Sequence, residues 1–332
     1  MIEVRTCARL HLGLLDYNGE LGRLYGSIGL AVNQPQLVLR AERAENLLVE
    51  GLEADRVGDY ARRFIRRHGR PAGARLNLIN SIPAHVGLGS GTQIALAVGT
   101  ALARLAGLRL SSAEIALAVG RGMRSGIGIA AFQRGGFVLD GGRRILSNPG
   151  GSPAPDRRVR QLEENGVPPV LFQHPVPEDW FFVTLVPDTN RGFSGETEDS
   201  AFLHLPVAPP SLVERISRLL LMKMLPALVE RDLLNFGRAL TGIQSMVGDF
   251  FASVQGGRYS NPLSGKLIGF LLDHGAAGAG QSSWGPAVYG VVDGKERAQR
   301  LLREAKDFLG SLGDGQVYCM QPRNRGAQVR RV

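Results

Sequence analysis

Apolar and polar positions along the first third of the chain predict long extended segments. VRTCARLHLGLLDY (residues 4–17) and GSIGLAVNQPQLVLRAE (26–42) both have strand composition, and the Asn18-Gly19 pair between them is a strong turn signal. ARLNLINSI (74–82) has the composition of a shorter strand. The N-terminal part of the chain is therefore expected to build a sheet.

Helical periodicity interrupts these strands in three places. Residues 54–69 form an amphipathic pattern, and Ser111 and Glu114 have capping-box spacing for a helix over residues 113–122. Between them, a helix is expected to follow a glycine segment and to end at Gly107. The apolar positions of the first and the central helix are Val57, Tyr60, Phe64, Ile65, Ile94, Ala97, Val98, Ala101, Leu102 and Leu105.

The second half of the chain begins after a Pro- and Gly-rich passage, residues 147–177, which is expected to be a loop between domains. Strands are predicted at 180–188, 287–293 and 316–322, and helices between 211 and 253 and at 266–275 and 295–310. Strands that alternate with pairs of helices favour a split β-α-β sandwich. The chain is accordingly expected to form an α+β protein with domains at 1–165 and 166–332.

Composition excludes several classes of protein. The hydrophobic fraction is 44% and the charged fraction 21%, as in globular proteins, and no apolar run approaches the roughly 20 residues of a membrane span. Charges at Glu3, Arg5 and Arg9 argue against a signal peptide. Only Cys7 and Cys319 are present, so we expect a reduced, cytoplasmic protein without a disulfide framework.

The net charge of +9 raises the possibility of an anionic partner. A nucleic-acid binder usually gathers its charge on one face and interleaves aromatic residues. Here the basic residues are scattered and aromatic residues make up only 6%. The basic residues are interpreted in one of two ways. They belong to solvated helix faces and a frayed tail at the C-terminus, or they contact a small polyanionic substrate, because arginine binds phosphates bidentately.

The segment GLGSGTQ (87–93) at the start of the central helix is the strongest chemical signal. It lacks the Lys-Ser/Thr of a Walker A loop, and Thr92 stands where a dinucleotide fingerprint has its third glycine. Glycines let backbone N–H groups approach a ligand, and the helix that follows offers unpaired amides to an anion. A tight turn before a packed helix is the alternative.

The motif PAHVGLGSGTQ (83–93) resembles the phosphate-loop motif of the GHMP small-molecule kinase superfamily. GAGQSSWGP (278–286) resembles its C-terminal glycine motif, and ARLHLGLLDYNGELGRLYGSIGLAV (8–32) takes the place of its N-terminal motif. The resemblance spans nearly the whole chain. It implies a two-domain GHMP-kinase-like fold, with an N-terminal mixed sheet with helices and a C-terminal ferredoxin-like sandwich.

The residues of these motifs, together with RGMRSGIGIAAFQRGGFVLDGG (121–142), resemble those of one branch of the superfamily, the β-ribofuranosylaminobenzene 5'-phosphate synthases. That branch implies condensation of 4-aminobenzoate with phosphoribosyl pyrophosphate, with release of CO2 and pyrophosphate, in tetrahydromethanopterin biosynthesis. It also implies a homodimer, and 4-hydroxybenzoate stays open as the aromatic acid. Mg2+ would suit the departing pyrophosphate; no organic cofactor is expected and ATP is not expected.

One departure from the superfamily favours this branch over an ATP-dependent kinase. Many GHMP kinases have an SG-x-D pattern whose aspartate acts as a base, and here Gly128 follows Ser125-Gly126-Ile127. A kinase for a small alcohol is the alternative enzyme. A basic nucleic-acid-binding protein on the same scaffold is the alternative outside enzymes, and no membrane partner is expected.

The candidate site residues follow from the three motifs, and each has a structural alternative. Arg9 and Arg124 are either anion ligands or surface ion pairs, and His11 either contacts a substrate carboxylate or is a core histidine. Trp284 either stacks on the aromatic substrate or packs between the two halves, and Glu196 either holds Mg2+ or is solvated. The expected catalytic residues are Arg9, His11, Arg124 and Ser125; the expected substrate-binding residues are Gly87, Gly89, Ser90, Gly91, Thr92, Gln93, Ser27, Gln281, Ser282, Ser283 and Trp284; the expected metal ligands are Glu196 and Asp16.

Overall fold

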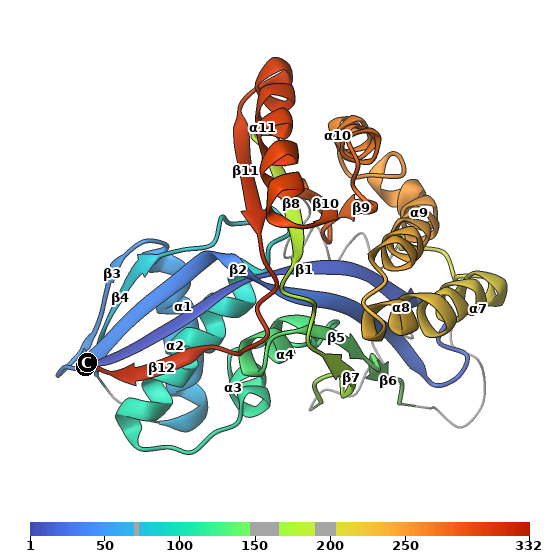
Figure 1. Ribbon diagram of the computed structural model, residues 1–332. Coiled ribbons are helices and arrows are strands. Elements are labelled where there is room, and N and C mark those ends of the chain that lie inside the picture. Colours follow the sequence, from blue (N-terminus) through green and yellow to red (C-terminus); the bar gives the residue numbers. More distant parts are fainter. Residues whose placement is uncertain (70–72, 147–165, 190–203) are drawn as a thin grey trace.

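Two sheets organise the chain in the computed structural model, which describes residues 1–69, 73–146, 166–189 and 204–332 (Figure 1). The first sheet has the order β12-β1-β2-β4-β3, and β5 and β6 pair with β2 beyond this path. All its pairs are antiparallel except β3 with β4. Its strands are β1 (Ile2–Asp16), β2 (Arg23–Arg43), β3 (Leu47–Gly51), β4 (Ala74–Asn80), β5 (Phe137–Asp140), β6 (Arg143–Arg144), β7 (Val170–His174) and β12 (Gln328–Arg331).

Helices α1 (Ala54–His68), α2 (Ser90–Ala106) and α4 (Ile127–Gln133) pack against this sheet, and α3 (Ser112–Ala118) packs against these three helices. Helix α2 is buried on nearly all sides, because it lies between the sheet and its neighbours α1 and α3. Its first turn is held directly beside β1, where Arg9 N–H donates to the Leu88 carbonyl at 3.1 Å.

The second sheet has the antiparallel order β11-β8-β10-β9. Its strands are β8 (Trp180–Pro187), β9 (Gly278–Gln281), β10 (Val288–Asp293) and β11 (Gly315–Met320). The accompanying helices are α7 (Pro210–Leu219), a π-helical turn η1 (Leu220–Met224), α8 (Leu225–Val229), α9 (Leu233–Gln255), α10 (Pro262–Asp273) and α11 (Lys295–Leu312). This order of strands and helices is the ferredoxin-like arrangement, so the expected α+β fold with a GHMP-kinase-like architecture is confirmed.

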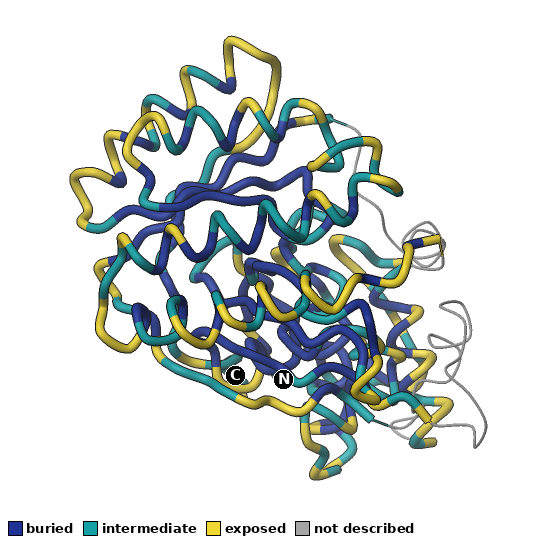
Figure 2. The backbone as a smooth tube through the Cα atoms, turned by 90° about the vertical axis from the view of Figure 1, so that its right-hand side faces the viewer, coloured by how far each residue is buried: buried dark blue, intermediate teal, exposed yellow. Residues whose placement is uncertain are grey.

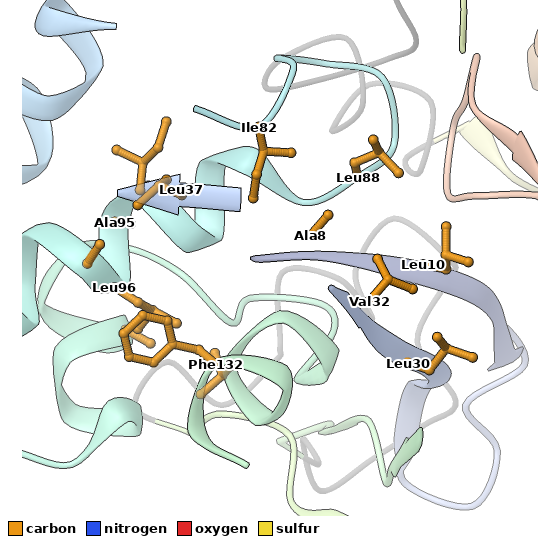
Figure 3. Close-up of a cluster of buried hydrophobic side chains, with 14 of the residues drawn as sticks. Ala8, Leu10, Leu30, Val32, Leu37, Ile82, Leu88, Ala95, Leu96 and Phe132 are labelled. Carbon is orange, nitrogen blue, oxygen red and sulfur yellow. The ribbon is translucent and has the colours of Figure 1, made fainter. Parts of the chain in front are cut away.

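Helix α9 connects the two sheets. Gln244 of α9 donates from Nε2 to the Leu12 carbonyl of β1 at 2.6 Å, and its Oε1 accepts from Gln281 N–H of β9 at 2.9 Å. Figure 2 shows the buried backbone running continuously through both sheets. In the close-up of Figure 3, Ile82, which precedes the glycine segment, and Leu88 within it lie with Ala8 and Leu10 of β1, all fully buried. The apolar core therefore fixes the glycine segment against β1.

Most of the predicted elements are confirmed, including the helix ending at Gly107 and the Ser111–Glu114 capping box. Two expectations were wrong. The passage 147–177 contains β7, and the frayed C-terminal tail instead contains β12. Both strands are completed by partners distant in sequence, as in the pairing of His174 with Phe137 and of Arg331 with Ile2.

The expected division at residue 165 falls at the end of a passage outside the described residues, and it stays a prediction. The strands β7 and β12 come from the second half of the chain and pair within the first sheet. Within the described ranges, no helix has the length and apolar character needed to cross a membrane.

Ser264 in α10 provides a test of packing in the second half. Its side chain is fully buried, and its hydroxyl has no hydrogen-bond partner among the described residues. Ser264→Ala should raise the free energy of unfolding by about 1 kcal/mol, because it removes an unsatisfied buried polar group and improves helix propensity. Urea unfolding followed by circular dichroism measures this change, and a loss of stability would show that the hydroxyl is satisfied by water.

Candidate functional site

The glycine segment between β4 and α2 is held by contacts on both sides. Gly87 and Gly89 have φ angles of +90° and +85°, which favour glycine. The Gly87 carbonyl accepts from Ser282 Oγ at 2.7 Å and from the Arg9 guanidinium. Ala287 N–H donates to the Val86 carbonyl at 3.1 Å. The loop is thereby fixed between β1 and the C-terminal glycine motif.

This geometry leaves backbone donors at the start of α2. The first intrahelical bond runs from Gln93 N–H to the Gly89 carbonyl at 3.2 Å. The amides of Ser90, Gly91 and Thr92 consequently have no acceptor within the helix. Because the loop carbonyls face β1 and Ser282, these amides and the positive end of the helix dipole form an anion-binding corner.

Arginine side chains surround this corner. A Cβ atom built on Gly89 would lie 3.1 Å from Arg9 Cγ, and one built on Gly91 would lie 2.8 Å from Arg121 Nη2 and 3.0 Å from Arg56 Nη2. Arg121 also lies over the Tyr60 ring, 5.1 Å from its centroid. Only glycine therefore leaves room for these guanidinium groups beside the first turn of α2.

The corner opens into a cavity of about 710 Å³. Six arginines line it, and no aspartate or glutamate is among its described lining residues. Among them, Arg56 pairs with Glu53 at 2.8 Å and Arg258 pairs with Asp249 at 2.7 Å. The six are Arg9, Arg56, Arg63, Arg121, Arg124 and Arg258. Such a lining suits a ligand that carries several negative charges.

Aromatic side chains also line the cavity. Trp284 and Phe251 meet edge to face with ring centroids 4.9 Å apart, and Tyr17 meets Phe251 at 5.0 Å. The Tyr17 hydroxyl is buried without a hydrogen-bond partner in the described ranges, and burial raises its pKa well above 10, so it stays a donor. Along β1, the lining runs from Arg9 to Leu14, a length of about 16 Å of strand at about 3.3 Å per residue.

His11 lies on β1 between Arg9 and Leu14, and it also lines the cavity. Burial, reinforced by the neighbouring Arg9 charge, lowers its pKa to about 3. The imidazole is therefore neutral at physiological pH. It can donate or accept a hydrogen bond toward the cavity, but it adds no positive charge.

The depressed pKa of His11 predicts a loss of stability in acid. In the unfolded chain His11 binds a proton below its ordinary pKa of 6.5, whereas in the folded protein it does so only near pH 3. Protonation therefore favours the unfolded chain, and the folded state loses stability as the pH falls below 6.5. Between pH 8 and pH 5 the wild type should lose about 2 kcal/mol more than His11→Gln. Urea unfolding at both pH values measures this, and the comparison at pH 8 isolates packing. Equal losses in the two proteins would contradict a neutral buried imidazole.

Three candidate ligands lie behind the cavity wall instead of on it. Ser282 Oγ accepts from His11 N–H at 3.0 Å while it donates to Gly87. Gln93 accepts from Thr6 Oγ1 at 2.6 Å and donates to the Gly128 carbonyl at 2.9 Å. Ser27 is fully buried on β2. These side chains position the loop, α4 and the wall.

Gln281 reaches the cavity, but its amide is already engaged. Its Oε1 accepts from the Ser260 hydroxyl at 3.2 Å, and its Nε2 donates to the Ser283 carbonyl at 3.0 Å. The candidates that line the cavity are Arg9, His11, Gly87, Gly89, Ser90, Gly91, Thr92, Arg124, Ser125, Gln281, Ser283 and Trp284.

Sequence reasoning did not single out Arg56, Arg63, Arg121 or Asp140. The arginines lie on α1 and after α3, in stretches that read equally well as solvated helix faces. Asp140 ends β5 and is fully buried. Burial raises its pKa, against the effect of the hydrogen bonds it accepts from Ser27, Gly142 and Gly126. An aspartate that follows the apolar run FVL and precedes Gly-Gly was the available signal.

The described residues do not fit a protein-held Mg2+ site. Asp16 is not part of the cavity lining, and its Oδ1 accepts from Asn18 N–H at 2.7 Å and Gly19 N–H at 3.0 Å within the turn after β1. Glu196 lies outside the described residues. Among those described, no three His, Cys, Asp or Glu side chains gather as a metal site would require.

Position 128 also has no space for an acidic side chain. A Cβ atom at Gly128 would lie 2.9 Å from Thr92 Cγ2 and 3.2 Å from Thr92 Cβ. The aspartate of the SG-x-D pattern would consequently displace Thr92 from the first turn of α2.

Two family models match this chain. The N-terminal domain of GHMP kinases matches residues 55–136, which hold the glycine loop, and the C-terminal domain of GHMP kinases matches residues 224–310. The crystal structure of L. major mevalonate kinase in complex with R-mevalonate superposes on this chain with a TM-score of 0.67 at 14% identity, covering 96% of each chain. This likeness supports the fold.

Two archaeal relatives match over nearly their whole length. The beta-ribofuranosylphenol 5'-phosphate synthase of Archaeoglobus fulgidus is 36% identical, and the match covers 99% of both chains. The synthase of the same name from Methanothermobacter thermautotrophicus is 34% identical, over 98% of this chain and 97% of the relative.

Proposed function

Because this chain belongs to the GHMP kinase superfamily and, within it, to the family of the archaeal beta-ribofuranosylphenol 5'-phosphate synthases, we propose that it joins a para-substituted benzoate to phosphoribosyl pyrophosphate. CO2 and pyrophosphate leave, and a C-riboside forms. The benzoate is 4-aminobenzoate, as the sequence motifs imply, or 4-hydroxybenzoate, which fits the name of the relatives. The product would enter tetrahydromethanopterin biosynthesis.

The observation that carries this proposal is the mixed lining of the cavity. Arginines lie with the first-turn amides of α2 at the glycine loop, and the aromatic side chains of Tyr17, Phe251 and Trp284 line the same cavity. A substrate pair with phosphates on one member and an aromatic ring on the other matches both features.

The bond changes of the reaction balance without a base. The ring carbon that bears the carboxylate is made electron-rich by the para substituent and attacks the anomeric carbon, while the bond to pyrophosphate breaks. The bond to the carboxylate then breaks, CO2 departs, and its electron pair restores the aromatic ring. An Asp in place of Gly128 would have no proton to accept.

The chain supplies positioning and charge for these steps. The amides of Ser90, Gly91 and Thr92 would bind the departing pyrophosphate, together with Arg9, Arg56 and Arg121. The relatives are named for a β-riboside, and phosphoribosyl pyrophosphate is an α-anomer, so the ring must approach from the face opposite the leaving group.

The direct test is CO2 release from carboxyl-labelled 4-aminobenzoate and 4-hydroxybenzoate, each with phosphoribosyl pyrophosphate, with and without Mg2+. We expect release from at least one acid, in equal amount to pyrophosphate. Unsubstituted benzoate should release none, because its ring lacks the donor substituent.

A parallel reaction with ATP separates the kinase alternative. ATP in place of phosphoribosyl pyrophosphate should give no CO2 release, and no ADP should form with small alcohols. Absence of release from both acids, with ADP formed instead, would replace the synthase with a kinase.

A further inference from the structure

A buried carboxylate lies directly behind the cavity wall. Asp140 Oδ1 accepts from Ser27 N–H at 3.1 Å and Gly142 N–H at 2.9 Å. Its Oδ2 accepts from Gly126 N–H at 2.8 Å and from the Ser27 hydroxyl. Asp140 takes part in none of the ion pairs between described residues. Four donors converge on its two oxygens, which is the arrangement that an ionised carboxylate requires.

This carboxylate reaches the cavity through two hydroxyl groups. Ser27 Oγ lies 2.7 Å from Ser125 Oγ, and Ser125 lines the cavity. A serine hydroxyl has one proton, and that of Ser27 is directed at Asp140. The proton between the two serines therefore belongs to Ser125. Ser125 Oγ also accepts from Ile127 N–H at 3.2 Å.

The consequence is that the hydrogen-bonding role of Ser125 toward the cavity is fixed. With its proton committed to Ser27, Ser125 faces the cavity as a hydrogen-bond acceptor and not as a donor. In a cavity lined by six arginines and by free helix amides, an acceptor backed by a buried negative charge has no role in binding phosphate. It suits a hydroxyl group of the substrate or a site of developing positive charge.

We propose that Asp140, acting through Ser27, makes Ser125 the acceptor for the ribose hydroxyl next to the reacting carbon, and so stabilises the positive charge on the sugar as pyrophosphate leaves. This inference rests on the proposed function. When the bond to pyrophosphate breaks, the ring oxygen and anomeric carbon share a cationic charge, and the neighbouring hydroxyl becomes more acidic. Its hydrogen bond to an acceptor then strengthens, as in glycoside hydrolysis.

The arrangement also answers an electrostatic problem of the cavity. The arginines that favour pyrophosphate disfavour a cationic sugar beside them. A carboxylate on the wall would compete for the arginines, whereas Asp140 is enclosed by its own donors. Its negative charge therefore acts on the sugar without binding the guanidinium groups. Asp140 is a positioning residue, and Ser125 is the group that touches the substrate.

Three variants test the chain of hydroxyls in turnover. Ser125→Ala and Ser27→Ala should each lower kcat by about 10- to 100-fold with little change in the KM for phosphoribosyl pyrophosphate. Asp140→Asn should do the same, because an amide donates to Ser27 and reverses the polarity of Ser125. Ser125→Thr keeps the hydroxyl and should restore most of kcat. Ser264→Ala, a buried serine outside the cavity, is the matched control.

A binding experiment tests the inference without turnover. The probe is an iminoribitol 5-phosphate, whose protonated ring nitrogen imitates the cationic sugar, in the presence of inorganic pyrophosphate. Calorimetry should show that Ser125→Ala and Ser27→Ala each weaken its binding about 10- to 100-fold. Removing the hydroxyl next to the anomeric position from the probe should weaken binding to the wild type equally, and binding to Ser125→Ala no further.

The two experiments separate the possible failures. If the wild type releases no CO2 but the probe binds with this pattern, the aromatic partner is wrong and the role of Asp140 stands. If CO2 is released but the serine variants turn over and bind the probe like the wild type, the inference is overturned and the synthase stands. Should Asp140→Asn fail to fold, the two serine variants still decide.

Discussion

Gly87→Ala should lower kcat/KM for phosphoribosyl pyrophosphate by at least about 100-fold and the free energy of unfolding by about 2–4 kcal/mol. Gly87 has a φ of +90°, and an added Cβ would lie 2.1 Å from the Ser282 carbonyl oxygen. That oxygen belongs to the backbone of the C-terminal glycine motif and cannot rotate away. The loop would have to leave β1, and the amides of Ser90 and Gly91 would move with it.

A matched glycine separates the clash from the strain of a positive φ. Gly22 has a φ of +79° and no atom within 4 Å of an added Cβ. Gly22→Ala should cost about 1 kcal/mol and leave turnover unchanged. Steady-state kinetics and urea unfolding of both variants give the comparison. If Gly87→Ala keeps turnover within a few-fold of Gly22→Ala, the proposed binding of pyrophosphate by this loop is wrong.

Local signals in the sequence were sufficient to predict the elements whose start, spacing and end are all set by residues of one segment. The helix from Ser90 to Ala106 has its apolar spacing, its glycine loop and its stop at Gly107 within one segment, and the Ser111 capping box lies within four residues. The strands β7 and β12 lack such signals. They are strands because a distant partner completes them, as Ile2 does for Arg331.

The residues of the candidate site likewise fall into those that a single motif predicts and those that only the fold brings together. The glycines and hydroxyls of the loop belong to one motif, so their residue types point to an anion directly. Arg56 and Arg121 are conventional surface residues in the sequence, and they become cavity residues because α1 and the segment after α3 both approach Gly91.

The direction in which a side chain points is a further property that the sequence does not contain. Ser282 and Gln93 are in the predicted motifs, but their side chains face the loop and α4 instead of the cavity. Whether a polar side chain binds a ligand or holds the wall depends on the partners that the fold supplies. Sequence reasoning identified the neighbourhood of the site, and tertiary structure assigns the roles.

Asp140→Ala should lower the free energy of unfolding by about 4 kcal/mol, because each buried donor left without an acceptor costs about 1–3 kcal/mol. The backbone N–H groups of Ser27, Gly126 and Gly142 all lose their acceptor in this variant. Asp140→Asn should lose about half as much, since its amide oxygen still accepts two of these bonds while its NH2 group faces the third donor. Urea unfolding followed by circular dichroism at pH 7 measures both changes.

The matched control is Asp59→Asn on α1, where the carboxylate is 61% exposed and pairs with Arg62. This variant should change stability by less than about 0.5 kcal/mol, because solvent screens an exposed ion pair. A loss below about 1 kcal/mol in Asp140→Ala would mean that water enters and satisfies the three amides. Water would then support the part of the cavity wall that carries Ser125. In that case the fold would not fix Ser125 as a hydrogen-bond acceptor through Asp140.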